Sequence, residues 1–350
     1  MKTDMHYFGI YALARAAGMR PGPAEIVATA SEYTDDAVWD KEVFLEDGRS
    51  ILAELTGHRL LDFKNADGED QRKVWLPFHF LPGGEGKTPT DKLLCGKNSP
   101  VAKKMVKRNT AIGAQASYGL YLMGITAHVY ADTFAHDGFM GANHSYNAIS
   151  AGSIELEVAD NGVLDYIQNK AKQFLEGVVS YGLSQTFPLG HAAATTYPDR
   201  PYLRWRYVRA ADGKTVEREN PKDYLDACRA MHEMFQDYLE KVPEHGQSRT
   251  AKQWRQIRHG LKKIIELEAD KPARIRAWKK AIRENRLFGG TTRIPVYKGP
   301  NWSASIDDLE AETIPKNMDK LPVYRFYQAA RIHRAQVLSN ILPPNDVIAA

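Results

Sequence analysis

The chain has 350 residues, and its hydrophobic content of 43% and charged content of 26% are those of an ordinary globular protein, which excludes a disordered chain. The sequence contains no apolar run of about 18 residues, so we expect no transmembrane segment. The formal net charge of +4 and the pI near 8.8 suit an anionic substrate or surface without selecting one.

The first residues do not resemble a secretory signal. Asp4 and His6 come early, and no clean apolar core precedes a cleavage site. We therefore expect a cytoplasmic protein, or a toxin-like effector exported by a secretion system that needs no signal peptide. Cys95 and Cys228 are not spaced as a metal-binding pair, and we expect no disulfide framework.

The predicted elements are helices along the whole chain. In order, they cover residues 7–17, 24–38, 99–137, 164–181, 221–239, two stretches within 247–286, and 324–338. Clusters of Gly and Pro predict loops at 46–86 and 187–207. We expect an all-α protein whose single core surrounds a buried central helix at 99–137. A metal-binding catalytic domain at 1–245 would carry a basic helical extension at 246–350, packed on it.

The central helix carries the most informative pattern, His128, Asp132 and His136, each four positions after the last. A step of four residues turns a helix by roughly 40°, so the three side chains share one face. Imidazole and carboxylate groups on a stiff support are what a zinc-type ion requires. Hydrogen-bonded core histidines are the plainer alternative, but a buried polar triad without a metal would be costly.

Other segments supply further candidate ligands. Each taken singly also fits a packed or solvated side chain, but together they exceed the three protein ligands of a typical catalytic zinc. We therefore expect a cluster of two or three zinc ions, or of another divalent metal, of the kind that cleaves phosphoesters. The candidates outside the triad are His6, Asp35 or Asp36, His79 and His191, with His144, Asn147 and Asp199 as reserves.

The segment 247–286 is strongly basic, with thirteen Lys and Arg against four Asp and Glu. Solvated faces of ordinary packed helices would explain this composition. The functional alternative is an electropositive surface for the phosphate groups of lipid or nucleic acid.

The order of these residues resembles the zinc-dependent phospholipase C and single-strand-specific nuclease superfamily. That order is an early His, an Asp, a His, then HxxxD on a central helix, and two later His residues. The closer resemblance, over roughly residues 5 to 240, is to an uncharacterised bacterial family related to that superfamily. It rests on four motifs: DD at 35–36, PFHFLPG at 77–83, GITAHVYADTFAHDGF at 124–139 and GHAAATTYPDRPYLRW at 190–205.

The resemblance implies a phospholipase C/nuclease-like all-α fold with a trinuclear zinc site. The implied ligands are Asp35 or Asp36, His79, His128 and Asp132 for one ion, His136 and His191 for a second, and His6 with a bridging Asp132 for a third. A metal-bound hydroxide would attack phosphorus, so the implied catalytic residues are Asp35, Asp36 and Asp132. The chain departs from the superfamily at three places. The next His usually lies six residues after the HxxxD Asp, whereas His136 lies four residues after Asp132. Met1 lies five residues ahead of His6, where the superfamily uses a free amino end as a ligand, and Thr195 replaces a later acid, whose role Asp199 would take.

We therefore expect a metal-dependent hydrolase of phosphoric diesters, phospholipase C-like, that makes peripheral contact with a membrane. A single-strand nuclease of the same fold is the first alternative, and Tyr197, Tyr202 and Trp205 would contact either substrate. An HD-type phosphohydrolase would use His136 and Asp137 as its HD pair. A helical protein that holds one structural metal and binds a partner would need no catalysis.

Overall fold

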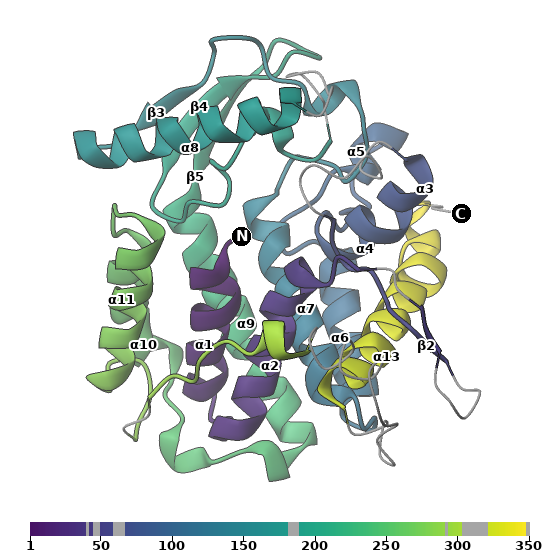
Figure 1. The fold of residues 1–350 in the computed structure, drawn as a ribbon, viewed down its shortest axis with the longest axis vertical. Helices are drawn as coiled ribbons and strands as arrows, with labels where there is room; N and C mark the ends of the chain where they lie inside the picture. The colour runs from purple at the N-terminus through teal and green to yellow at the C-terminus, as the bar shows by residue number, and fades with distance from the viewer. Residues whose placement is uncertain are drawn as a thin grey trace.

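The computed structural model describes residues 1–39, 42–44, 50–58, 67–180, 189–290, 293–302 and 321–347 (Figure 1). The fold is mainly helical, as the sequence predicts. The helices, with π-helical turns marked η, are η1 (Asp4–Gly9), α1 (Ile10–Ala16), α2 (Pro21–Asp36), α3 (Gly68–Asp70), η3 (Gln71–Trp75), α4 (Leu76–Phe78), α5 (Pro89–Leu93), α6 (Pro100–Gly113), α7 (Gly119–Ala135), α8 (Asn161–Ser180), α9 (Asn220–Lys241), α10 (Trp254–Ile265), α11 (Lys271–Arg283), α13 (Pro322–Ala335) and η10 (Gln336–Ile341).

Two small antiparallel sheets correct the expectation of a purely α-helical fold. One pairs β1 (Glu42–Phe44) with β2 (Ser50–Leu52), and the other has the order β3 (Glu155–Glu157), β4 (Arg204–Val208) and β5 (Thr215–Glu219). Strand β4 lies at the end of the segment predicted as a loop. Its residues alternate between exposed arginines and buried aromatics, which is the period-two pattern of a strand with one buried face.

Helix α7 is the centre of the helical bundle. All but one of its residues are buried, and it packs against α2, α6, α9 and α13 (Figure 1). The buried central helix is therefore confirmed. A helix this apolar on all sides can only be stable when other helices surround it.

The predicted single helix at 99–137 is wrong, because the chain turns between α6 and α7. Ser99 caps α6 by accepting a hydrogen bond from the Ala102 amide at 3.1 Å, as the Ser-Pro pair predicts. At the turn, a Cβ atom on Gly119 would lie 1.9 Å from the carbonyl oxygen of Gly113, so only glycine allows this approach. The two helices then pack side by side, which a straight helix of this length could not do within one core.

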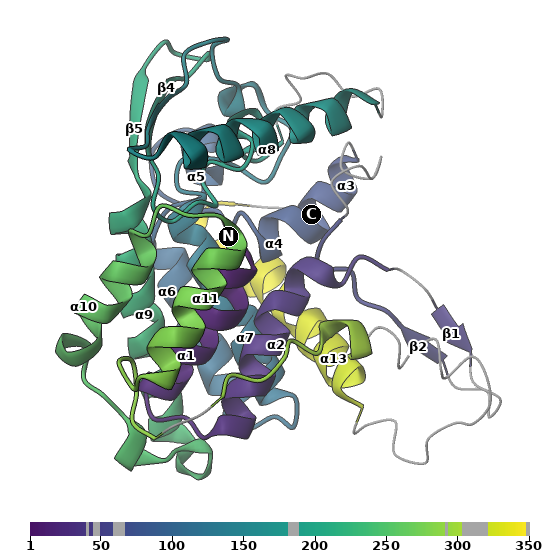
Figure 2. The ribbon, with the colours of Figure 1, turned by 60° about the vertical axis from the view of Figure 1, so that its left-hand side comes forward.

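A second layer covers the end of the bundle at which α7 finishes. Figures 1 and 2 show α8 and the sheet β3–β4–β5 lying across one end of the helices, with the N-terminus at the junction. A separate hydrophobic cluster holds this layer together, and it includes Ile167 and Ala171 of α8 and Trp205 and Tyr207 of β4. The junction between the two layers is where the candidate site lies.

The remaining helices extend the same bundle. The predicted helices within 247–286 are confirmed as α10 and α11, and Trp278, Ile282 and Phe326 belong to one hydrophobic cluster with Met5 and Leu122. The predicted loop at 46–86 lies partly outside the described residues, and its later part forms the helical turns α3, η3 and α4 instead. Among the described residues, no helix is long and apolar enough to cross a membrane.

Candidate metal centre

Helix α7 points two of the predicted ligands toward the junction. His128 and Asp132 are 0% and 1% exposed, and His128 Nε2 lies 3.3 Å from Asp132 Oδ2. His136 directly follows the last residue of α7, and its Nδ1 lies 3.7 Å from the same oxygen. The structure therefore brings the triad together as the spacing predicts, although His136 caps the helix rather than standing on it.

Four histidines share a feature that prepares an imidazole to bind a metal. Each places one ring nitrogen 2.7–2.8 Å from a backbone carbonyl oxygen, which fixes that nitrogen as the N–H donor. The other nitrogen of each ring faces a carboxylate, and those of His79 and His128 also face one another at 3.2 Å. The pairs of histidine and carbonyl are His79 with Thr56, His128 with Ser31, His136 with His79, and His191 with Thr195.

Three carboxylates, those of Asp35, Asp132 and Asp199, lie near these ring nitrogens. Asp35 Oδ1 lies 3.7 Å from His79 Nδ1 and 3.8 Å from His128 Nε2. Asp199 Oδ1 lies 3.5 Å from the Nε2 atom of His136. Its distance from His191 Nε2 is 3.7 Å. Asp199, a reserve candidate in the sequence, is thus a central member of the cluster.

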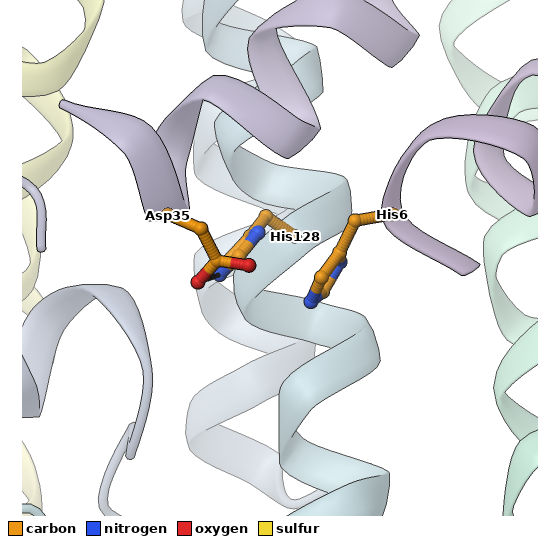
Figure 3. A group of neighbouring side chains, drawn as sticks. All are labelled: His6, Asp35 and His128. Atoms are coloured by element: carbon orange, nitrogen blue, oxygen red, sulfur yellow. Dashed lines mark ion pairs between the residues drawn. The ribbon is translucent and has the colours of Figure 1, made fainter. Parts of the chain in front are cut away.

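His6 completes one side of the cluster. Its ring is fully buried and stacks on His128 with 3.8 Å between ring centroids. Neither of its ring nitrogens has a hydrogen-bond partner in the described part of the chain, and its Nε2 lies 3.2 Å from Asp132 Oδ1. Figure 3 shows His6, Asp35 and His128 converging from three different helices. Buried and unpaired ring nitrogens are costly unless something binds them.

The ligand atoms form three groups, each within 4.8 Å of one another. The groups are His6, Asp35 and His128; then His79, His128 and Asp132; and finally His136, His191 and Asp199. Nitrogen and oxygen donors in sets of three fit zinc or a similar divalent ion with an open coordination position. Asp132 turns one oxygen toward His6 and the other toward His79 and His128, so it can serve two neighbouring sites.

The α-amino group of Met1 also reaches the cluster. Its nitrogen lies 2.7 Å from Asp132 Oδ1 and 3.3 Å from Asp199 Oδ1, and it is fully buried. These carboxylates raise its pKa from 8.0 to about 10, although burial opposes the charged form. The space between the two carboxylates therefore attracts positive charge.

The electrostatics of the cluster keep its acids ionised. Burial alone would raise the pKa of Asp132, but the Met1 ammonium and the surrounding imidazoles outweigh burial and hold this pKa well below its usual value. Asp199 has the same balance, with Lys2 as its strongest positive neighbour, and its pKa is also well below the usual value. The site thus presents fixed negative charge to a cation.

The pKa values of the histidines shift in both directions. Burial lowers the pKa of His6 to about 3 and that of His191 to about 4, so both rings are neutral at physiological pH and able to bind a metal. Burial also opposes the charged form of His128, but Asp132 and Asp35 outweigh it and raise its pKa.

A cavity of about 380 Å³ opens above the cluster, and we call it the metal pocket. Asp132 and His136 line it from the end of α7, Asp199 from the segment before β4, and Phe174 from α8. Phe80 stacks on His136 with 4.5 Å between ring centroids, which fixes that imidazole from behind. The cluster is therefore accessible to a small molecule from the junction of the two layers.

Several predicted residues do not join the cluster. Asp36 lines the metal pocket, but its Oδ2 accepts a 2.5 Å hydrogen bond from the Tyr297 hydroxyl, and burial raises its pKa. His144 accepts a hydrogen bond from the Tyr146 amide and Asn147 bonds to the backbone of Met140, so both order their own loop. The structure thus places Asp35, rather than Asp36, among the candidate ligands.

The three predicted substrate aromatics have different surroundings. Tyr197 and Trp205 are 8% and 4% exposed and pack in the hydrophobic cluster of the upper layer, away from the metal pocket. Tyr202 belongs to that cluster too, but it also lines a second cavity beside the metal pocket. Of the three, Tyr202 is the one whose side chain lines a cavity next to the site.

The sequence prediction missed Lys2 and the four carbonyl groups that orient the histidines, and it counted the position of Met1 as a departure although its amino group reaches the cluster. Carbonyl groups carry no residue-type signal, so no motif could have indicated them. Lys2 forms a 2.9 Å ion pair with Asp199 Oδ2. Lys2 and Asp199 are far apart in the sequence, and nothing around either residue indicates that they pair.

Residues 1–341 match a protein family of unknown function, DUF6765. The chain belongs to this family. No curated protein and no solved structure matches the chain. The DUF6765 match runs through both the cluster and the C-terminal helices, and the function has to be argued from the chemistry of the site.

Proposed function

We propose that this DUF6765 protein is a divalent metal-dependent hydrolase of phosphoric diesters, with a phospholipase C/nuclease-like metal centre and zinc as its natural metal. The observation that carries the proposal is the set of four carbonyl-oriented histidines whose free nitrogens face three ionised carboxylates at the base of an open cavity. Bound ions would supply Lewis acidity to the phosphoryl oxygens and lower the pKa of water at the site.

Residues of the chain supply the remaining functions. Glu32 lines the metal pocket, and burial together with Asp35 raises its pKa to about 8. Its Oε1 accepts a 2.5 Å hydrogen bond from Thr3 Oγ1, which holds the carboxyl group in place. Glu32 can therefore hold a proton at neutral pH and give it to the leaving oxygen. Phe174 of α8 adds an apolar side chain to the lining of the cavity.

The open cavity favours catalysis over a purely structural metal. A structural site is closed by protein ligands, whereas each group here offers three and faces a cavity. The HD-type alternative gains less support, because the Asp137 carboxylate accepts a 2.9 Å hydrogen bond from the Lys97 amide. It joins no candidate ligand group among the residues that the structure describes.

Hydrolysis of bis(p-nitrophenyl) phosphate by the purified protein tests the proposal. We expect Asp132→Asn to lower kcat/KM by roughly 100-fold or more, because it removes a carboxylate that serves two candidate sites. Asp137→Asn is the matched control, five residues away, and should retain activity close to that of the wild type. The reverse ranking would favour the HD-type chemistry, and a wild type without activity on phosphodiesters would refute the proposed function.

A further inference from the structure

A second cavity adjoins the metal pocket, and several cationic side chains line it. It has a volume of about 500 Å³ and is lined from α8 and from the beginning of α11. It shares Lys2, Phe174, Thr196 and Asp199 with the metal pocket. We call it the Arg200 pocket. Nothing in the proposed hydrolysis itself requires a cationic cavity of this size beside the metal pocket.

The charges in the Arg200 pocket do not balance. Five cationic side chains line it together with two carboxylates, Asp4 and Asp199. Asp4 Oδ2 pairs with Arg274 Nε at 2.7 Å and Asp199 Oδ2 pairs with Lys2 Nζ at 2.9 Å, so both carboxylates are already engaged. Within the described ranges, no carboxylate lies within 4.0 Å of the three cations that are left over, which are Lys170, Arg200 and Lys271.

Arg200 is held rigidly although it has no acidic partner. Its guanidinium lies over the Tyr166 ring at 5.1 Å, and its Nη2 donates a 3.0 Å hydrogen bond to Thr196 Oγ1. The side chain is 9% exposed, and its buried Nε finds no hydrogen-bond partner in the part of the chain that the structure describes. A fixed and nearly buried guanidinium without a carboxylate is expensive, and its planar fork matches the oxygens of a phosphate.

The pocket disfavours other kinds of ligand. Uncompensated positive charge repels a cation, so the quaternary ammonium of a choline headgroup would bind poorly. Two of its aromatic rings are also engaged, because Arg200 covers Tyr166 and Arg274 lies 5.4 Å from the centre of the Tyr202 ring. These rings support the guanidinium groups rather than offering a free surface for an apolar or cationic ligand.

Asp199 connects the two cavities. Its Oδ1 faces His136 and His191, and its Oδ2 faces Lys2. An anion in the Arg200 pocket would therefore lie beyond Asp199 from the candidate metal ligands, at the other end of a molecule whose phosphodiester sits in the metal pocket. We infer that the Arg200 pocket binds a second phosphate group of the substrate, so that the enzyme acts on phosphodiesters that carry a further phosphate. This inference rests on the proposed function.

A pair of chromogenic substrates that differ by one phosphate tests the inference. Thymidine 5′-(p-nitrophenyl phosphate) carries only the reacting diester, and its 3′-phosphorylated form adds a second phosphate. We expect the 3′-phosphate to raise kcat/KM of the wild type about tenfold or more. The double variant Lys170→Gln/Lys271→Gln, which changes two exposed side chains, should lose most of that advantage while its kcat/KM for the simpler diester stays near that of the wild type.

Two further variants complete the design. Arg200→Gln should remove the advantage most fully, and the double variant keeps the test valid if the buried Arg200→Gln protein does not fold. Lys280→Gln is the control. It removes an exposed charge of α11, the helix that carries Lys271, but lies outside the pocket, so the 3′-phosphate should still raise kcat/KM fully. Equal kcat/KM for both substrates in the wild type, or an advantage that survives in the pocket variants, would overturn the inference.

Calorimetry separates this inference from the proposed function and identifies the source of the phosphate. Thymidine 3′,5′-bisphosphate should bind the full-length protein more tightly than thymidine 5′-phosphate, by about tenfold, and the pocket variants should lose this difference. This readout needs no turnover, so it decides on the pocket even if neither diester is hydrolysed. Binding of inorganic phosphate that depends on Arg200, without any preference for the bisphosphate, would assign the pocket to the free anion and overturn the substrate inference.

Discussion

His128 shows how a single side chain is prepared for its role. Its Nδ1 lies 2.8 Å from the carbonyl oxygen of Ser31, which directs Nε2 into the cluster, 3.2 Å from His79 Nδ1. That nitrogen faces Asp132 and Asp35 across distances of 3.3 Å and 3.8 Å. The backbone hydrogen bond orients the imidazole, so its position does not depend on a bound metal.

A histidine outside the cluster makes the stability of the protein depend on pH. His333 is fully buried between Asn109 and the Pro77 carbonyl, and burial lowers its pKa from 6.5 to about 4. The unfolded chain therefore binds a proton more readily than the folded chain. The contribution of His333 is fully present above about pH 6.5 and is lost as the pH falls toward 4.

We expect His333→Gln to weaken this dependence. Between pH 7 and pH 5, the free energy of unfolding of the wild type should fall about 2 kcal/mol further than that of the variant. Urea denaturation of both proteins at the two pH values measures the difference. His259→Gln, an exposed histidine on α10, is the control and should behave like the wild type. Parallel pH profiles for wild type and His333→Gln would contradict the assignment.

Residue types predicted much of the candidate site, but not which neighbours compete for each side chain. Asp35 and Asp36 are adjacent in the sequence and were equal candidates. The structure separates them because the Tyr297 hydroxyl bonds to Asp36, while Asp35 faces two histidines. A contact between residues 261 positions apart has no local signature in a single sequence.

The close approach of α2 and α7 sets the spacing of the cluster, because one helix carries Asp35 and the other carries His128. Gly124 permits this approach. A Cβ atom at Gly124 would lie 2.5 Å from both Ala30 Cβ and the Val27 carbonyl oxygen. The backbone atoms of α2 cannot move aside without moving the whole helix.

Gly124→Ala should therefore push the two helices apart. We expect a loss of roughly 1–3 kcal/mol in the free energy of unfolding and weaker binding of added zinc. Gly22→Ala, in α2, is the matched control, because its Cβ would meet nothing within 4 Å and alanine favours a helix. Thermal unfolding with and without zinc measures both effects. If the two variants behaved alike, the helix spacing would not control the site.

Helices with strong local signals were predicted correctly, whereas the break between α6 and α7 and strand β4 were missed. Strong local signals, such as Ser99-Pro100 at the start of α6 and the apolar run of α7, gave correct helices. The break between α6 and α7 was missed because Ala114, Gln115 and Ala116 allow a helix locally, whereas the close contact of Gly113 with Gly119 decides it. Strand β4 was missed because the prolines that precede it favoured a loop, although the RWRYV alternation was present.

Across the whole molecule, the C-terminal helices complete the bundle that carries the site. Arg274 of α11 is 3% exposed and pairs with Asp4, and Trp278 is packed in the same cluster as the N-terminal helix. We expect a chain ending at residue 245 to lose cooperative unfolding, because removal of Trp278 and the residues packed with it would expose the apolar side of the N-terminal helix to water. Near-ultraviolet circular dichroism with a thermal scan tests this, and a sharp transition like that of the full chain would contradict it.

The central claim is that the His and Asp cluster binds divalent metal. Elemental analysis of the full-length protein, purified without chelators, tests it most directly. The account predicts two or three ions per chain, zinc foremost, with at least one lost in Asp132→Asn, because the cluster offers three ligand groups and Asp132 serves two of them. A wild type without bound metal, whose Tm does not rise on adding zinc, would contradict the account and leave the cluster as a hydrogen-bonded network.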